Sequence, residues 1–300
     1  MASNLIMVKG DTYYIDGAVN IGVIRDPVQR DKCILIDTGM DDDSGKKILK
    51  LLNESGMTPS AIINTHSHAD HCGGNSIIRS RTGAAIYAPV FDCGIIEYPE
   101  LEPFYLFSAA PLKELDTKFL KAKPSKVDHV IGFGELNIGN IGLQILSLKG
   151  HTPHMIGVAS SDGVLFAGDA FFSTEIIEKY GLPYFSDIKE TLKTLEYFEN
   201  LEYHYYIPCH GRLLENPRQT VAANIKVIND TVQLILDSCS ASYLDREAIA
   251  AGIIEKYGIR LTVPQYYLTI STVSAFLSYM CNDGLLRHEF VDSRLKFTKA

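Results

Sequence analysis

The chain has 300 residues, with 36 Asp and Glu against 28 Lys and Arg, and a formal net charge of −8. Its 46% hydrophobic content and many aromatic residues are typical of a globular protein, which excludes disorder as the main state. No apolar run approaches the roughly 18–20 residues that span a bilayer, and the first residues lack the pattern of an export signal. Six scattered cysteines fit reduced thiols, so we expect a cytoplasmic protein.

Short apolar and β-branched runs, separated by Gly, Asp and Pro, open the chain. They predict strands over 12–15, 20–24, 33–36, 61–64 and 84–88. A helix is expected at about 43–55, because Ile48, Leu51 and Leu52 recur with helical spacing. Residues 91–126 then interrupt the pattern, since aromatics and prolines are frequent there and no period is clear. We interpret this stretch as an insertion over the fold rather than a layer of its core.

Further along the chain, strands are expected over 143–148, 164–167 and 205–207, with a helix at about 187–200. After residue 214 the pattern becomes mostly helical, with predicted helices at 217–236, 245–257 and 271–281 and a strand-like end at 288–297. Strands and helices interleave before that point, which indicates an α/β class with a small, mainly helical C-terminal extension. We therefore expect two domains, 1–214 and 215–300.

Three histidines and one aspartate fall within six positions directly after the predicted strand 61–64: His66, His68, Asp70 and His71. Neutral imidazole and carboxylate are good ligands for zinc and its first-row neighbours. The alternate spacing of His66 and His68 suits two ligands of one ion, while Asp70 and His71 are displaced toward a second. A histidine-rich surface loop is the alternative, but such groups rarely cluster without a metal or a catalytic role.

Three more candidate ligands each follow a predicted strand: His151, Asp169 and His210. Each comes after an apolar run and a small or turn residue, which places functional groups along one rim of a sheet. A single histidine after a strand is more often structural than a ligand. In combination with the histidine cluster, these residues indicate one metal site.

These motifs resemble those of the metallo-β-lactamase superfamily. The run His66–His71 matches its HxHxDH signature, and Leu35–Gly39 looks like its early strand-end motif. Its later single-residue motifs are matched, in order, by His151, Asp169 and His210. The resemblance spans about residues 10–212. It implies an αββα sandwich with a two-metal site between the upper edges of two sheets.

The resemblance also implies the role of each site residue. It assigns His66, His68 and His151 to a first metal, Asp70, His71 and His210 to a second, and Asp169 to both. Two divalent ions about 3.5–4 Å apart would share a hydroxide and polarise the scissile bond. Zn2+ is the default for such a site, and Mn2+ or Fe also suits it. Asp70 and Asp169 are then the catalytic residues, and Asp37 hydrogen-bonds a ligand histidine.

The metal site predicts a class of reaction and not a substrate. Aromatic residues near the rim suggest a pocket for a substrate with an apolar part, lined by Phe171, Phe172, Tyr184 and His154. The equally favoured alternative is that these rings line no pocket and only pack the insertion onto the sandwich. Acyl-homoserine lactonases place a tyrosine where Phe172 stands, which weakens the match to that group. Five lysines between Lys113 and Lys126 either meet an anionic group or form a solvated face.

The C-terminal region resembles the winged-helix-like tail of lactamase-β-like-2-type proteins, some of which cleave single-stranded RNA. Residues 215–300 carry nine basic and nine acidic side chains, whereas a nucleic-acid surface is normally basic. That balance favours a role in packing, as a pocket wall or in a homodimer.

The sequence therefore predicts a metal-dependent hydrolase of a small-molecule ester, thioester or lactone. One alternative is a single-stranded RNA nuclease of the same fold. The other is a non-catalytic binding protein, which is disfavoured because all seven proposed ligands are present.

Overall fold

The structure is a computed structural model that describes residues 4–240 and 242–300. The chain forms two compact units that interleave in sequence. The first unit comprises residues up to 148 with 154–170 and 201–217, and the second comprises 149–153, 171–200 and 218–300. Segments 149–153 and 171–200 are thus in the same compact unit as the C-terminal helices. The division into domains 1–214 and 215–300, expected from the sequence, stays a prediction.

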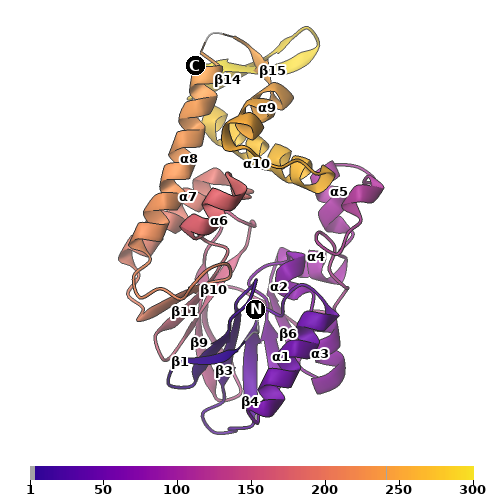
Figure 1. The fold of residues 1–300 in the computed structure, drawn as a ribbon, viewed down its shortest axis with the longest axis vertical. Coiled ribbons are helices and arrows are strands. Elements are labelled where there is room, and N and C mark those ends of the chain that lie inside the picture. Colours follow the sequence, from indigo (N-terminus) through magenta and orange to yellow (C-terminus); the bar gives the residue numbers. More distant parts are fainter. Residues whose placement is uncertain (1–3, 241) are drawn as a thin grey trace. The chain divides into compact units, whose positions relative to one another are not determined.

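The first unit contains a sheet of seven strands in sequence order (Figure 1). Its strands are β1 (Leu5–Lys9), β2 (Thr12–Ile15), β3 (Ile21–Arg25), β4 (Lys32–Ile36), β5 (Thr58–Ile63), β6 (Ala85–Pro89) and β7 (His129–Ile131). The first four strands pair antiparallel, and β4 to β7 pair parallel. Parallel pairing brings the carboxyl ends of β4 and β5 to the same edge of the sheet. The histidine cluster follows β5 in the chain and therefore begins at this edge.

A second sheet of the same unit has the strand order β12-β11-β10-β9-β8. Its strands are β8 (Gly134–Ile138), β9 (Ile141–Ser147), β10 (Ile156–Ser160), β11 (Val164–Gly168) and β12 (Tyr205–Pro208). Only β11 and β12 pair parallel. Buried side chains of the two sheets form one core cluster, in which Ile36 and Ile63 join Val158 and Phe166. The two sheets are therefore the layers of a sandwich.

Helices cover the other face of the seven-stranded sheet (Figure 1). Helix α1 (Asp42–Glu54) buries Ile48 and Leu52 against it, as the helical spacing predicts, and α3 (Asn75–Thr82) buries Ile78 there. Between them lies the single turn α2 (Ala69–Cys72). The expected insertion 91–126 contains α4 (Asp92–Glu97), α5 (Leu101–Phe107) and a 3-10 turn (Lys113–Leu115), and no strand.

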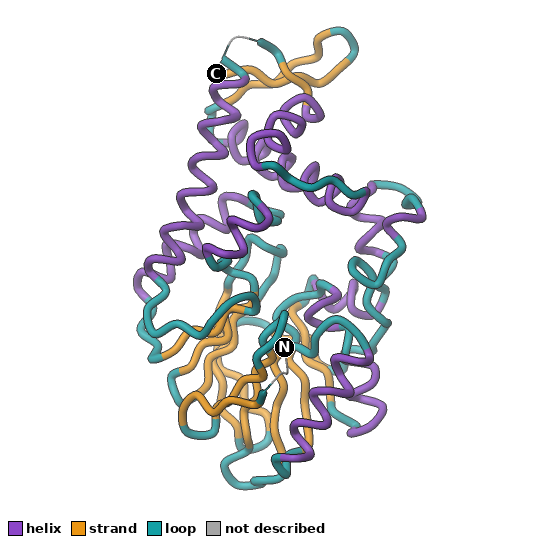
Figure 2. The backbone as a smooth tube through the Cα atoms, in the orientation of Figure 1, coloured by secondary structure: helices purple, strands orange, loops and turns teal. Residues whose placement is uncertain are grey.

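The second unit is mainly helical (Figure 2). Its helices are α6 (Thr174–Tyr180), α7 (Ile188–Tyr197), α8 (Arg218–Ser238), α9 (Arg246–Tyr257) and α10 (Val263–Asn282), with a 3-10 turn at Phe198–Asn200. A small sheet joins β13 (Leu244–Asp245), β15 (Arg294–Lys299) and β14 (Leu286–Val291). The strand-like end expected at 288–297 is a hairpin, because Asp292 and Ser293 both adopt positive φ and turn the chain.

Helix α10 begins well before the expected residue 271. Thr262 caps it by accepting a hydrogen bond from the Gln265 amide, and Pro264 stands in its first turn. Within residues 4–240 and 242–300, no helix combines the length and the apolar character needed to cross a membrane.

Candidate metal centre

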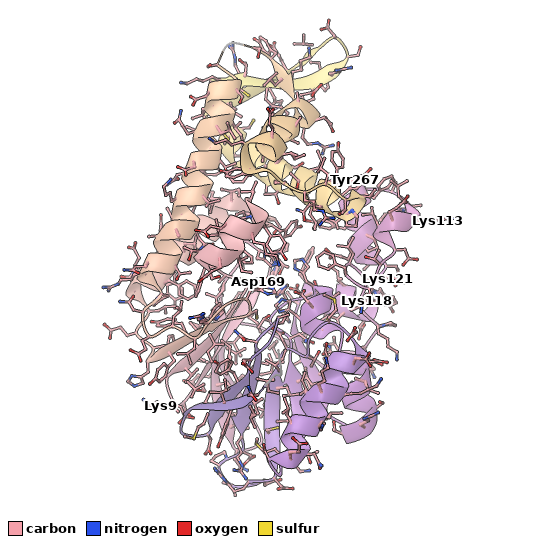
Figure 3. All side chains as sticks on the ribbon, in the orientation of Figure 1. Lys9, Lys113, Lys118, Lys121, Asp169 and Tyr267 are labelled. Atoms are coloured by element: carbon pink, nitrogen blue, oxygen red, sulfur yellow. The ribbon has the colours of Figure 1, made fainter. Side chains whose placement is uncertain are left out.

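The candidate ligands of the first unit follow the carboxyl ends of neighbouring strands. His66–His71 comes after β5, Asp169 directly after β11, and His210 shortly after β12. Because β11 and β12 run parallel, their ends meet at one edge, and Figure 3 labels Asp169 there. Each of these segments leaves its strand as irregular backbone, which allows side chains from distant parts of the sequence to converge.

His66 and His68 face each other through single ring nitrogens. Nε2 of His66 lies 3.1 Å from Nδ1 of His68. Two imidazole nitrogens on one tetrahedral zinc ion lie about 3.3 Å apart, given Zn–N bonds of about 2.0–2.1 Å. The other nitrogen of His66, Nδ1, lies 3.0 Å from Oγ1 of Thr65. The pair is thus arranged as two ligands of one ion would be.

His71 is fully buried, and its two nitrogens have different surroundings. Nδ1 lies 2.9 Å from Oδ2 of Asp37, which fixes the ring. Nε2 has no hydrogen-bond partner within the described part of the chain, and it lies 3.7 Å from Oδ1 of Asp70 and 3.7 Å from Oδ1 of Asp169. A buried imidazole nitrogen facing two carboxylates fits a divalent cation, because the cation would satisfy all three groups.

His210 approaches the same two carboxylates from β12. Its Nδ1 is 2.9 Å from the carbonyl oxygen of Ala18, and its Nε2 lies 3.3 Å from Oδ2 of Asp70 and 3.5 Å from Oδ2 of Asp169. Asp169 also has an oxygen close to ligand atoms of His66 and His71. Its carboxylate therefore lies between the histidines expected for the first metal and those expected for the second.

The charges of these groups depend on each other. Burial alone would raise the pKa of Asp70, but the neighbouring imidazoles of His71 and His210 outweigh it and lower this pKa to about 2. Burial alone would lower the pKa of His210, but Asp169 and Asp70 raise it to about 9. The pKa of His71 is raised well above its ordinary value for the same reason, since surrounding negative groups outweigh burial. The site thus attracts positive charge.

Asp37 connects several of these segments. Oδ1 accepts a hydrogen bond from the Thr65 amide at 2.8 Å, and Oδ2 accepts one from the Thr65 hydroxyl at 2.8 Å in addition to the contact with His71. The hydrogen bond from a candidate ligand histidine to Asp37, expected from the sequence, is therefore confirmed. Asp37 has a φ of 63°, which Asp tolerates better than most residues.

Two glycines allow α3 to begin close to this network. A Cβ on Gly73 would lie 1.9 Å from the carbonyl oxygen of Met40, and one on Gly74 would lie 2.3 Å from that of Thr38. Both contacts are far below van der Waals distance. No other residue fits at these positions without a backbone shift.

The two cysteines beside the cluster, Cys72 and Cys209, are buried. Burial raises the pKa of both thiols strongly, which keeps them in the thiol form. Cys209 also lies close to Asp37 and His71, so only the expected burial of the two residues is confirmed, and their role beside the ligands stays a prediction.

His151 belongs to the second unit, and its local contacts lie there. Its Nδ1 is 3.0 Å from the carbonyl oxygen of Tyr184, and the rings of Tyr184 and Phe172 flank it at 5.5 and 5.7 Å between centroids. Phe171 points elsewhere: it is 1% exposed and packs edge-on against Phe198 at 5.0 Å. Phe172 and Tyr184 thus flank His151, while Phe171 contacts another buried ring; a role of these residues in a substrate pocket stays a prediction.

His154 lies in the first unit and stacks on Phe91 of the insertion, with centroids 5.9 Å apart and planes within 4°. No cluster of candidate ligands among the described residues includes it. The lysines of the insertion pair with carboxylates in three cases, Lys118 with Asp41, Lys123 with Asp42 and Lys121 with Asp116. These pairs favour the solvated face over an anion site.

Two buried acids near the cluster escaped the sequence-based predictions. Asp92 accepts a hydrogen bond from the Ser67 amide at 2.9 Å, and Glu102 places Oε1 3.8 Å from Nε2 of His68. Burial, reinforced by Asp92, raises the pKa of Glu102 to about 8. The one available signal was an acid inside an aromatic-rich run of irregular pattern, which is too weak to predict a contact.

A sandwich of two sheets with histidines and aspartates converging at one edge defines a class of metal-dependent hydrolases. The family model of the metallo-beta-lactamase superfamily matches residues 14–210, and the chain belongs to this superfamily. Similar solved structures include a beta-lactamase domain protein from Burkholderia ambifaria, with a TM-score of 0.76 and 15% identity over 99% of this chain and 93% of the other. A metallo-beta-lactamase family protein from Thermus thermophilus has a TM-score of 0.74 and 17% identity over 100% and 99%. The fold is that of the superfamily.

Curated relatives are similar over shorter stretches. Probable metallo-hydrolase YqgX of Bacillus subtilis is 30% identical over 56% of this chain and 77% of its own length. A hydroxyacylglutathione hydrolase of Erythrobacter litoralis is 31% identical over 45% and 43%, and the beta-lactamase-like protein 2 homolog of Drosophila melanogaster is 28% identical over 68% and 63%. The chain thus covers less than two thirds of the latter two relatives.

Proposed function

We propose that the protein is a dinuclear metal hydrolase that cleaves a small-molecule ester, thioester or lactone. The observation that carries the proposal is the buried Nε2 of His71, which faces Asp70 and Asp169 at 3.7 Å and has no hydrogen-bond partner within the described residues. Hydrogen bonding among the described residues leaves this nitrogen unsatisfied, whereas a divalent cation satisfies it together with both carboxylates.

The proposed ligands are those expected from the sequence: His66, His68 and His151 for one ion, Asp70, His71 and His210 for the other, and Asp169 between them. Bound divalent ions supply an acidified water and polarise the scissile carbonyl. Zn2+ suits the imidazole-rich donor set, and Mn2+ or Fe also suits the carboxylate bridge.

The chain's own residues contribute orientation and proton transfer in this proposal. Asp37, Thr65 and the Ala18 carbonyl hold ring nitrogens of His71, His66 and His210, so that the opposite nitrogens face the centre. Asp70, whose pKa of about 2 keeps it ionised at neutral pH, orients the attacking water. Asp169 maintains the separation of the two sets of histidines.

A small acyl compound is supported as substrate by three points. The names of several curated relatives, hydroxyacylglutathione hydrolases, describe enzymes that cleave a thioester. The balanced charge of residues 215–300 disfavours binding of nucleic acid, which normally needs an excess of basic residues. Phe172 and Tyr184, which flank His151, provide apolar surface for an acyl group.

Metal analysis tests the centre. We expect the wild-type chain to bind two divalent ions per molecule and His71→Ala or Asp169→Ala to lose at least one, while far-UV circular dichroism stays unchanged. His129→Ala is the matched control, because His129, on strand β7, stacks on Tyr87 at 4.4 Å and is in no group of candidate ligands among the described residues. Unchanged metal content in both site variants would refute the centre.

A substrate panel tests the reaction. Metal-replete protein is assayed with thioesters, lactones, aryl esters, a phosphodiester, a β-lactam and single-stranded RNA. We expect turnover of an acyl compound that is abolished by a chelator and by His71→Ala. Cleavage of RNA without turnover of any acyl compound would replace the proposal by the nuclease alternative.

A further inference from the structure

His68 is held between two features of the first unit. Its Nδ1 faces Nε2 of His66 at 3.1 Å, which makes Nδ1 the metal-facing atom. Its opposite nitrogen, Nε2, faces Oε1 of Glu102 at 3.8 Å. Glu102 lies on helix α5, in the insertion 91–126, and is only 4% exposed.

The other candidate histidines share one arrangement. Within the first unit, each turns one ring nitrogen to the centre and holds the other against an oxygen of the protein: the Thr65 hydroxyl for His66, Asp37 for His71 and the Ala18 carbonyl for His210. Such partners fix the tautomer and the orientation of a ligand ring. Glu102 presents an oxygen in the corresponding place behind His68.

We propose that Glu102 is a positioning residue of the metal centre, which accepts a hydrogen bond from the Nε2–H of His68 and so holds Nδ1 toward the first metal. The inference rests on the proposed function, since it requires a metal at His66 and His68. Hydrogen bonds of this kind are about 2.7–2.9 Å long, so a movement of about 1 Å closes the contact when His68 binds its ion. An oxygen of Glu102 accepts this bond in either protonation state of the carboxyl group.

The burial of Glu102 also supports this role. A buried carboxyl group is unfavourable unless it is paired, and Glu102 is buried on the same helix as the apolar residues Pro103 and Leu106. The second buried acid of the insertion, Asp92, reaches the same segment by accepting the Ser67 amide. Two acids of the insertion thus support residues 66–68, which makes the insertion a wall of the metal centre.

The test measures metal affinity in three variants of the full-length protein. Zn2+ binding is followed by competition with a chromophoric chelator, and the melting temperature is measured on metal-free protein. For Glu102→Leu we expect the affinity of one site to fall about 10–100-fold, as for other residues that support a ligand, while the metal-free protein melts no lower than wild type. Glu102→Gln keeps an acceptor oxygen, so its affinity should fall less than that of the leucine variant. Glu100→Gln, an exposed position at the start of α5, is the matched control and should bind as wild type.

A spectroscopic measurement separates positioning from general stability. Long-range 1H–15N spectra of the metal-loaded protein should show the proton of His68 on Nε2, and Glu102→Leu should weaken its protection from exchange with solvent. A wild type that binds two ions, with both Glu102 variants matching its affinities and its His68 signal, would overturn the inference. If Glu102→Leu does not fold, Glu102→Met, which also lacks an acceptor oxygen, takes its place under the same criterion. A wild type that binds no metal would instead refute the proposed function.

Discussion

Two aspartates four positions apart show how differently the same side chain acts in two regions of the molecule. Asp37, at the end of β4, is 1% exposed and contacts Thr65, His71 and the thiol of Cys209. Asp41 precedes α1 near the surface, where it accepts a hydrogen bond from the Ser44 amide and pairs with Lys118. The first connects strands and candidate ligands, and the second caps a helix and pairs with a lysine near the surface.

The difference follows from solvent access. When an acceptor is removed from a buried network, water cannot reach its donors. Each unsatisfied donor then lowers the free energy of unfolding by its full desolvation cost. Removing an acceptor at the surface lets water replace it. We therefore expect substitutions around Asp37 to affect folding and the metal centre together, and substitutions around Asp41 to affect only the helix.

The largest effect is expected for Asp37→Ala. The amide and hydroxyl of Thr65 and the Nδ1 of His71 would lose their acceptor, and alanine would have to adopt the φ of 63°. The free energy of unfolding of the metal-free protein should fall by about 3–5 kcal/mol. Urea titration measures this change.

The control is Asp37→Asn, which tolerates the same φ and keeps one carbonyl oxygen, and it should cost less. An alanine variant as stable as the asparagine variant would mean that the hydrogen bonds of Asp37 do not hold this region together.

A smaller effect is expected for Asn75→Ala, one step further from the cluster. The Asn75 amide group donates to Oδ1 of Asn64 at 2.7 Å, and its carbonyl oxygen accepts from the Thr38 hydroxyl at 2.8 Å. Loss of these two buried bonds should cost about 2 kcal/mol in the free energy of unfolding. Ser80→Ala, on an exposed part of the same helix, should leave urea unfolding unchanged, and an equal loss in both variants would contradict the role of the buried network.

The cluster could be predicted from the sequence because its information is local. His66, His68, Asp70 and His71 are adjacent in the chain, and the motif needs only a strand before it. The bond from His71 to Asp37 depends instead on the parallel pairing of β4 with β5, in which Ile36 lies beside Ile63. Resemblance to a family suggested that contact, and no spacing in the sequence would have shown it.

The contact of Glu102 with His68 could not be predicted, because it depends on the path of an insertion without a regular period. The start of α10 was missed for a different reason. Its cap, Thr262, and the proline that follows are visible in the sequence, but the apolar pattern alone predicts a helix only from residue 271 onward. Local capping chemistry was sufficient there and tertiary information was not needed.

On the surface side of the comparison, Asp41→Ala should lower the free energy of unfolding by about 1 kcal/mol, the usual effect of losing a helix cap. Asp41→Asn keeps an acceptor for the Ser44 amide and should cost only a few tenths of that amount. Metal content should be unchanged in both variants. Loss of metal in Asp41→Ala would show that the two regions are coupled and would break the comparison.

The smallest effect is expected for Lys118→Ala, and it should be visible mainly in the pH dependence. The hydrogen bond from Lys118 is the largest of the causes that lower the pKa of Asp41 to about 2. Because this pKa lies below the value of about 3.9 in the unfolded chain, ionised Asp41 stabilises the fold above about pH 4, and this contribution is lost as the pH falls toward 2. In Lys118→Ala the pKa of Asp41 should rise toward its ordinary value, as measured by 13C NMR titration of its carboxyl carbon.

Lys121→Ala, which removes a lysine paired with Asp116 instead, should leave the titration of Asp41 unchanged. An unshifted Asp41 in Lys118→Ala would assign the low pKa to the Ser44 contacts, and the surface region would then depend on the helix cap alone.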